Sequence, residues 1–215
     1  MFEHPSPSPR LASRRGNDPA GGRWVETMTD ERLVTLSQEG NLRAFNDLTD
    51  RWQGSIYRYV LRLIGNEEDA RDVCQEALVK AYQNIGRLRD GRKFKPWLHH
   101  IALNLCRDRY RSAGAKAEVR PFEEEGADEG RLAAERARDL SPEELLSRAD
   151  VNRTLAEVMQ KLPEEQRAAI LLREYHGFTS EEIGEITGVP AATVRTRIFY
   201  GLRTARRLLG QRGLI

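Results

Sequence analysis

The last third of the chain restricts its fold most, because two short helical patterns flank a Gly-Val-Pro turn there. Thr179 precedes the first pattern as a predicted N-cap, and Glu182 three residues later completes a capping box. Gly188 predicts the end of that helix, and Pro190 suits the first position of the next. We therefore predict two helices joined by a tight turn, which is the arrangement of a helix-turn-helix.

The second of these helices has one apolar face and one basic, aromatic face. Spacings of three and four residues give the apolar stripe Val194, Ile198, Leu202, Ala205 and Leu209. The opposite face holds Arg195, Thr196, Phe199, Tyr200, Arg203 and Arg206. Such side chains suit phosphate and base contacts in a DNA major groove. A plain αα-hairpin with a solvated basic face remains the alternative from this pattern alone.

Charge is unevenly distributed, although the formal net charge is only +2. From Ile186 to Ile215 there are six arginines and no Asp or Glu, and from Gly86 to Arg120 there are ten basic and three acidic residues. Between these blocks, Phe122 to Leu146 holds nine acidic and three basic residues. This alternation suggests two nucleic-acid contacts separated by a segment that avoids phosphate.

Composition favours an intracellular, all-α protein that is not an enzyme. Helix-forming residues dominate, no apolar run is long enough to span a bilayer, and no signal-peptide core is present, so we expect a cytoplasmic location. Cys74 and Cys106 are expected to be small buried thiols rather than a disulfide. The adjacent His99 and His100 have no metal-ligand spacing, so neither a metal nor a cofactor is expected, and no catalytic motif competes.

The chain divides into two predicted folded blocks. Residues 1–27 are rich in Pro, Ser, Gly and Arg and are expected to be a disordered tail. Met28 is followed at once by a helix start, so either Met1 or Met28 can be the true start of the protein. Residues 28–112 form the first block, 113–141 a flexible acidic linker, and 142–210 the block that contains the helix-turn-helix.

The first block contains three further well-marked helical patterns. One ends at Gly65, and the next starts near Glu67 with an inward face of small and branched residues and an acidic outer face. After a basic loop, Gly86 to Lys95, a last helix carries Trp97. Trp97 suits either a core position or a DNA-binding groove, and the pattern does not choose between them.

Three motifs in order resemble the small, two-domain extracytoplasmic-function (ECF) group of the sigma-70 family of RNA polymerase sigma factors. The first motif is Gly65 to Ala77, with its Asp-Ala-x-Asp and Gln-Glu pairs. The second is Phe94 to Asn104, similar to the family's Phe-x-x-Trp-Leu-x-x-Ile-Ala-x-Asn signature. The third is Leu162-Pro163 followed by the helix-turn-helix. The resemblance covers about Met28 to Leu209.

This resemblance implies a function and a set of partners. The N-terminal block would be sigma region 2, which binds core RNA polymerase and opens the −10 element without ATP, and the C-terminal block would be region 4, which reads the −35 element. The implied partners are the β′ clamp helices and β flap of the polymerase, promoter DNA and a cognate anti-sigma factor, with no small-molecule substrate. The acidic linker would be either a mimic of the RNA backbone or a solvated tether.

The implied site residues follow from the matching positions. The polymerase-facing patch would be Asp69, Asp72, Gln75 and Glu76. The single-stranded −10 contacts would be Arg87, Arg89, Arg92, Lys93, Lys95, Trp97, Asn104, Arg107 and Arg111. The −35 contacts would be Arg195, Thr196, Phe199 and Tyr200, with Arg197 and Arg203 on phosphates. Gly201 departs from the pattern of many relatives and weakens a helix interior by roughly 1 kcal/mol.

Two other classes of protein compete with this interpretation. A stand-alone DNA-binding regulator would use the helix-turn-helix without polymerase, but it leaves the acidic helix face and the Trp97 helix unexplained. An enzyme acting on RNA or DNA would need a catalytic constellation, and the sequence offers none.

Overall fold

The computed structural model describes residues 28–113 and 142–213, and every regular element in these ranges is helical. The N-terminal bundle, residues 28–113, consists of α1 (Asp30–Gln38), α2 (Leu42–Ile64), α3 (Glu67–Asn84), the 3-10 turns η1 (Ile85–Arg87) and η2 (Gly91–Lys93), and α4 (Phe94–Ala113). The C-terminal domain, residues 142–213, consists of α6 (Pro142–Gln160), α7 (Glu164–Glu174), α8 (Ser180–Thr187) and α9 (Ala191–Gly210). The all-α prediction is confirmed. The expected tail and nearly all of the expected linker lie outside the described residues.

Local capping explains where the helices of the N-terminal bundle start. The side chains of Thr29, Asn41 and Asn66 accept hydrogen bonds from backbone N–H groups in the first turns of α1, α2 and α3. These bonds satisfy donors that a helix leaves unpaired at its start. Gly65 ends α2 with a φ of 79°, a left-handed conformation that glycine adopts without steric cost.

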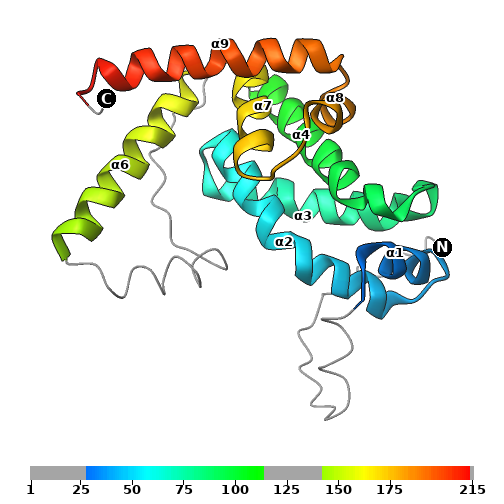
Figure 1. Cartoon of the computed structure of the whole chain (residues 1–215). Coiled ribbons are helices and arrows are strands. Elements are labelled where there is room, and N and C mark those ends of the chain that lie inside the picture. The colour runs from blue at the N-terminus through cyan, green and yellow to red at the C-terminus, as the bar shows by residue number, and fades with distance from the viewer. Residues whose placement is uncertain (1–27, 114–141, 214–215) are drawn as a thin grey trace, which may run out of the picture.

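The N-terminal bundle is built around α2, which packs against α1, α3 and α4 (Figure 1). Leu48, Ile56 and Tyr59 on α2 are fully buried. Helix α3 presents mainly alanines to this core, so the helices approach closely. The predicted inward face of α3 is therefore confirmed. The helical spacing of Phe45, Leu48, Trp52 and Ile56 predicts a buried face on α2 as well, and of these Trp52 is only partly buried.

The last helix of the N-terminal bundle begins earlier than the sequence indicated. We expected Lys95 in the basic loop, but α4 starts at Phe94, and the preceding segment is tightened by η1 and η2. Phe94 is 1% exposed, so burial of its ring fixes the start of α4 against the core. Pro96 then falls in the first turn, where a proline removes no intrahelical hydrogen bond.

The C-terminal domain packs α7 and α8 against α9 (Figure 1). Val194 and Ala205 face inward as predicted, but Leu202 is 45% exposed and the neighbouring Gly201 is buried. A Cβ atom at Gly201 would lie 2.7 Å from Ile170 Cδ1, so the glycine allows α9 to lie close to α7. The predicted stripe is wrong at Leu202 because this close approach rotates Gly201, rather than Leu202, toward α7.

Two smaller expectations also need correction. The helical spacing of Val151, Leu155, Val158, Met159 and Leu162 predicts one inward face, but Val151 is 45% exposed, whereas Val158 and Met159 are buried. Pro190 is the N-cap of α9 rather than its first residue. Such one-residue differences are usual at helix ends.

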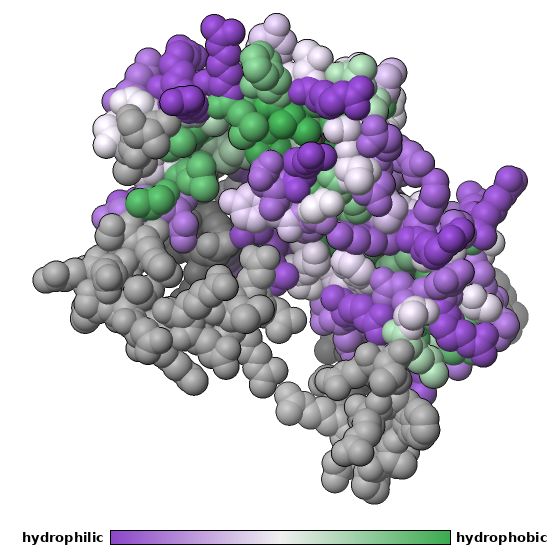
Figure 2. Space-filling model, viewed as in Figure 1, coloured by the Kyte–Doolittle hydropathy of each residue, from purple (hydrophilic) through white to green (hydrophobic). Residues whose placement is uncertain are grey.

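The two domains lie in contact, which the sequence did not predict. Helix α8 packs on α4, and α7 packs on α2 (Figure 1). Figure 2 shows an apolar patch in the region of α7 and α9, whereas polar side chains cover most of the remaining described surface in that view. None of the helices in the two described ranges is long and apolar enough to cross a membrane.

Candidate nucleic-acid interface

The helix-turn-helix is fixed by local interactions at both ends of α8. The Thr179 side chain accepts from the backbone N–H of Glu182, and a carboxylate oxygen of Glu182 accepts from the backbone N–H of Thr179 at 2.8 Å. Gly188 ends α8 in the left-handed conformation with a φ of 74°. A Cβ atom at Gly184 would lie 2.7 Å from the Val189 carbonyl oxygen, so the turn requires glycine there. The predicted capping box and helix end are both confirmed.

The outer face of α9 presents most of the predicted −35 residues to solvent. Arg195, Thr196 and Arg203 are exposed. Phe199 and Tyr200 are 61% and 51% exposed, and their rings meet edge to face with centroids 5.3 Å apart. An Nη1 atom of Arg195 lies 3.5 Å from a carboxylate oxygen of Glu181 on α8. This weak surface contact leaves the guanidinium available to a stronger partner.

Arg197 differs from the other arginines of α9. It is partly buried, and its Nη1 atom is buried without a hydrogen-bond partner among the described residues. Buried guanidinium groups are costly unless they are paired. The Arg197 guanidinium therefore points toward the interior of the C-terminal domain, whereas Arg203 is exposed.

A second basic surface surrounds the start of α4. Arg87, Arg89, Arg92 and Lys93 are exposed in the segment that carries η1 and η2. Asp90 caps η2 and binds the Arg92 guanidinium at 3.0 Å, and that hydrogen bond holds the pKa of the Asp90 carboxyl below its usual range. The segment is therefore an ordered basic turn.

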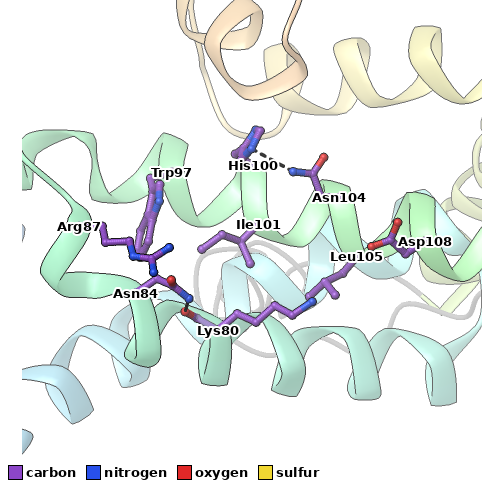
Figure 3. A pocket seen from close by; sticks show the side chains of 9 residues that line it. All are labelled: Lys80, Asn84, Arg87, Trp97, His100, Ile101, Asn104, Leu105 and Asp108. Atoms are coloured by element: carbon purple, nitrogen blue, oxygen red, sulfur yellow. Dashed lines mark hydrogen bonds between the residues drawn. The ribbon is translucent and has the colours of Figure 1, made fainter.

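A cavity of about 370 Å³ lies between α3 and α4 beside this basic segment (Figure 3). Its wall contains three of the predicted −10 residues, Arg87, Trp97 and Asn104. Trp97 is partly buried and packs on Phe94 with ring centroids 6.0 Å apart, so it serves the core and the cavity wall together. Such a combination of aromatic, amide and basic side chains suits an unstacked base next to a phosphate.

The sequence missed other residues of this cavity. His100 accepts a hydrogen bond from Asn104 Nδ2 at its Nε2 atom, over 2.9 Å, and Lys80 lies on the opposite wall (Figure 3). Lys80 pairs with Glu76 one turn before it on α3, at 3.0 Å. The four-residue spacing of His100 and Asn104 was the only sequence signal for their contact.

Lys95 Nζ donates to the backbone carbonyl oxygen of His176 at 2.7 Å, and the other two remaining −10 residues of α4 are engaged in ion pairs. Arg107 Nε donates to Glu164 of α7 at 3.3 Å, and Arg111 pairs with Asp108 one turn before it. The first pair joins the two domains, whereas the second stays within α4. Arg111 is exposed, and Arg107 is partly buried.

The predicted polymerase-facing patch lies on the outer side of α3. Asp72, Gln75 and Glu76 are exposed, and Asp69 is partly buried. Arg109 of α4 bonds both Asp69 and Asp72, an interaction that the sequence analysis missed because these residues are far apart in the chain. The patch therefore contacts two basic side chains, Arg109 at Asp69 and Asp72 and Lys80 at Glu76.

Both cysteines lie in the core of the N-terminal bundle. Cys74 and Cys106 are free and buried, as predicted. Burial raises the pKa of the Cys74 thiol to about 11. Within residues 28–113 and 142–213, no three His, Cys, Asp or Glu side chains lie together in a way that suits a metal ion.

Comparison with family models assigns both domains. Residues 48–116 match Sigma-70 region 2, and residues 152–204 match Sigma-70, region 4. The first match contains α3, α4 and the cavity, and the second contains the helix-turn-helix. The three sequence motifs thus fall within the matched regions.

Similar curated proteins cover most of the chain. The RNA polymerase sigma-H factor of Pseudomonas aeruginosa is 35% identical over 173 residues, which are 79% of this chain and 88% of that protein. The ECF RNA polymerase sigma factor SigW of Bacillus subtilis is 33% identical over 187 residues, 86% of this chain and 98% of that protein. The ECF RNA polymerase sigma-E factor of Escherichia coli K12 is 34% identical over 177 residues, 81% of this chain and 91% of that protein.

Solved structures share the fold. CnrH, solved in complex with the cytosolic domain of CnrY, has a TM-score of 0.61 at 24% identity and covers 85% of this chain and 97% of its own. The sigma factor RpoE of Bartonella quintana, solved with the anti-sigma factor NepR, has a TM-score of 0.60 at 19% identity and covers 79% and 98%. Taken with the family matches and the curated relatives, these findings show that the chain belongs to the ECF sigma factors of the sigma-70 family, non-enzymatic subunits that bind core RNA polymerase and direct promoter-specific transcription initiation.

Proposed function

We propose that the exposed face of α9 reads the −35 element in duplex DNA. The base-reading side chains are Arg195, Thr196, Phe199 and Tyr200. They are exposed on one face of α9, the helix that follows the capped helix α8 and its turn. An arginine in this position can bond both acceptors of a guanine in the major groove. Arg203 contacts phosphate, and Arg197 does so after its partly buried side chain turns outward.

The basic segment and the cavity form the site for the −10 element. Arg87, Arg89, Arg92, Lys93 and Lys95 bind the backbone of the displaced strand, and Arg107 and Arg111 extend this basic track along α4. The cavity lined by Trp97 and Asn104 receives one extruded base. Unstacking a base costs a few kcal/mol, which these contacts offset without ATP.

The acidic face of α3 binds the polymerase. Asp69, Asp72, Gln75 and Glu76 meet basic side chains on the β′ clamp helices, and charge complementarity sets much of the specificity. The C-terminal domain contacts the β flap. The functional boundaries are then 28–112 for region 2, 113–141 for the linker and 142–210 for region 4.

Control by an anti-sigma factor is suggested by a protein of the same fold. RpoE of Bartonella quintana was solved with an anti-sigma factor, and its fold matches that of this chain. We infer a cognate anti-sigma factor for this protein as well, and a cytoplasmic location, where polymerase and promoter DNA are found.

One observation carries these assignments. The same chain has an exposed face of basic and aromatic side chains on α9 and, between α3 and α4, a cavity lined in part by basic residues. The test is capture of bacterial core RNA polymerase by the full chain, followed by transcription from the DNA upstream of its own gene. Stable capture with a new start site supports the assignments and maps the promoter. Specific duplex binding without any capture of polymerase would contradict them.

A further inference from the structure

The basic segment between α3 and α4 is held by a helix that contributes no residue to the proposed −10 site. Gln38, the last residue of α1, donates from Nε2 to two backbone carbonyl oxygens, that of Ile85 at 2.9 Å and that of Leu88 at 2.7 Å. These partners lie 47 and 50 positions further along the chain, so the contact is tertiary. The two N–H groups of one amide thus hold both ends of η1.

The chemistry of these partners determines how the Gln38 amide is oriented. A backbone carbonyl oxygen can only accept, so the NH2 group of Gln38, rather than its Oε1 atom, must face Ile85 and Leu88. The carbonyl oxygen of Ile85 also accepts from the backbone N–H of Leu88 at 3.1 Å, the bond that closes η1. The last carbonyls of a helix have no partner inside the helix. Gln38 supplies one from α1, and a side chain without donors could not replace it.

The two carbonyls flank arginines that the proposed −10 site uses. Arg87 lies between Ile85 and Leu88 in the chain, and Arg89 follows Leu88 directly. Arg87 also lines the cavity between α3 and α4 (Figure 3). Both arginines are exposed, so packing does not fix where their side chains lie. The position of their guanidinium groups therefore depends on the backbone that Gln38 holds.

A second contact with α1 supports the other end of the segment. A Cβ atom at Gly91 would lie 2.9 Å from the Cα atom of Glu31, so the backbones of η2 and α1 touch there. At Gly86, in η1, a Cβ atom would meet no other described residue within 4 Å. The two glycines of the segment therefore differ in their distance from α1, which makes them matched positions for a test.

Helix α1 is a firm support because it is itself anchored in the N-terminal bundle. Leu33 is 1% exposed in the core. At the start of α1, Asp30 accepts from Trp52 Nε1 of α2 at 2.9 Å and pairs with Arg51. Through Gln38, the bundle core therefore determines where the basic segment lies.

We propose that Gln38 is a positioning residue for the −10 strand: its two carbonyl bonds hold Arg87 and Arg89 where the displaced strand can bind them. Gln38 itself does not touch DNA. A segment that already has its bound shape loses less conformational entropy when the strand binds. Without Gln38, only a fraction of the molecules would present both arginines correctly, and the apparent dissociation constant would rise by the inverse of that fraction. This inference rests on the −10 site proposed above.

The first experiment replaces Gln38 in the full chain, assembled with core RNA polymerase. Gln38→Met keeps the length of the side chain and removes both donors, and Gln38→Glu turns an acceptor toward two carbonyls. Gln83→Met and Gln83→Glu make the same changes at an exposed glutamine of α3, near the segment. Fluorescence anisotropy measures binding of the non-template −10 strand from the mapped promoter, and titration with labelled core enzyme checks assembly.

We expect strand affinity to fall roughly fivefold in Gln38→Met and roughly tenfold in Gln38→Glu, because the second change adds repulsion to the lost bonds. Both Gln83 variants should stay within about twofold of the wild type. All four variants should keep wild-type affinity for core enzyme. Wild-type strand affinity in both Gln38 variants, equal losses at Gln83, or a matching loss of affinity for core enzyme would each overturn the inference.

A double-mutant cycle separates positioning from a general effect on the fold. Arg87→Ala with Arg89→Ala removes the groups that Gln38 places, so adding Gln38→Met to that variant should cost less than about twofold. A further loss of about fivefold would show that Gln38 acts elsewhere and would overturn the inference. If the arginine variant bound the strand as tightly as the wild type, the −10 assignment of these arginines would be wrong. If the arginine variant lost affinity and the Gln38 variants did not, that assignment would stand and only the inference would fail.

The two glycines test the support from α1 at its other contact. Gly91→Ala requires the segment to move away from Glu31, whereas Gly86→Ala adds a methyl group in open space. We expect Gly91→Ala to weaken strand binding at least about threefold and Gly86→Ala to weaken it less than about twofold. An equal effect in the two variants would contradict the support of the segment by α1 and overturn the inference.

Discussion

Arg109 of α4 bonds the carboxylates of both Asp69 and Asp72 on α3, at 2.9 and 2.8 Å. The two acids belong to the patch assigned to polymerase, so the patch is organised by a basic residue of its own chain. Side chains held in this way lose less conformational entropy on binding than free ones would. The contact also ties α3 to α4, which links the polymerase face to the helix assigned to the −10 strand.

Replacing Asp72 tests the polymerase patch. Asp72→Arg places two guanidinium groups together, removes one acceptor from Arg109 and reverses a charge at the proposed interface. We expect affinity for core polymerase to fall at least about tenfold, as for other charged interface residues, with helical content unchanged. Titration with labelled core enzyme measures it, and Glu39→Arg, at the exposed end of α1, controls for net charge. Unchanged affinity would show that the acidic face is only solvated.

Replacing Arg195 tests the −35 assignment. If its guanidinium reads a guanine, Arg195→Ala should cost about 1–3 kcal/mol at one base pair and relax the preference there. Binding of polymerase holoenzyme to a panel of −35 duplexes, each with one base pair changed, gives the measurement. Arg173→Ala removes an exposed arginine of α7 for comparison. An equal loss on every duplex would reassign Arg195 to a phosphate.

Replacing Gly201 tests the close approach of α9 to α7. Alanine favours a helix by roughly 1 kcal/mol over glycine, but its Cβ would lie 2.7 Å from Ile170 Cδ1 and 3.2 Å from Gln166 Cβ. We therefore expect Gly201→Ala to lower the free energy of unfolding by about 1–3 kcal/mol, the usual cost of overpacking. In contrast, Gly54→Ala on α2 meets Arg58 Nη1 at an ordinary 3.5 Å and should stabilise the protein. Urea denaturation of both variants makes the comparison, and a gain at Gly201 would contradict the packing.

His99 Nε2 lies 3.3 Å from His176 Nδ1, and this pair of a buried and a partly buried histidine predicts acid sensitivity. Burial lowers the pKa of His99 to about 4 and that of His176 to about 3, and the charged groups near the pair are the cations of Lys95, Arg58 and Arg62. The unfolded chain binds protons near pH 6.5 while the folded pair stays neutral. The stability that depends on the neutral histidines is therefore fully present above about pH 6.5. Below that pH the free energy of unfolding falls by up to roughly 1.4 kcal/mol per pH unit for each histidine.

Urea denaturation between pH 7.5 and 5 measures this loss, because most carboxylates titrate below that range. His176→Phe keeps an aromatic ring and removes one titrating group, so its stability should depend less steeply on pH. An identical pH dependence in the variant and the wild type would contradict the role of the pair.

Much of the fold follows from interactions between residues close together in the chain. The Thr179–Glu182 capping box, the helix start at Thr29 and the left-handed ends at Gly65 and Gly188 each involve residues within about one turn of a helix. Such patterns act in the same way wherever the helix lies in the molecule, so they can be predicted from the sequence. The polar and aromatic face of α9 could be predicted for the same reason, whereas the exposure of Leu202 could not.

The tertiary structure decided what depends on distant partners. Lys93 Nζ pairs with a carboxylate oxygen of Glu185 at 2.9 Å, and His99 contacts His176. The members of each pair are far apart in the chain, and nothing in the residues around either member indicates the other. Gly201 is a weak point of α9 by helix propensity alone, and only the position of Ile170 against it explains why glycine is needed there. Local hydrogen bonding and periodicity therefore determined the helices and their polar faces, whereas packing between elements determined which cations are exposed, which are paired and how the two domains meet.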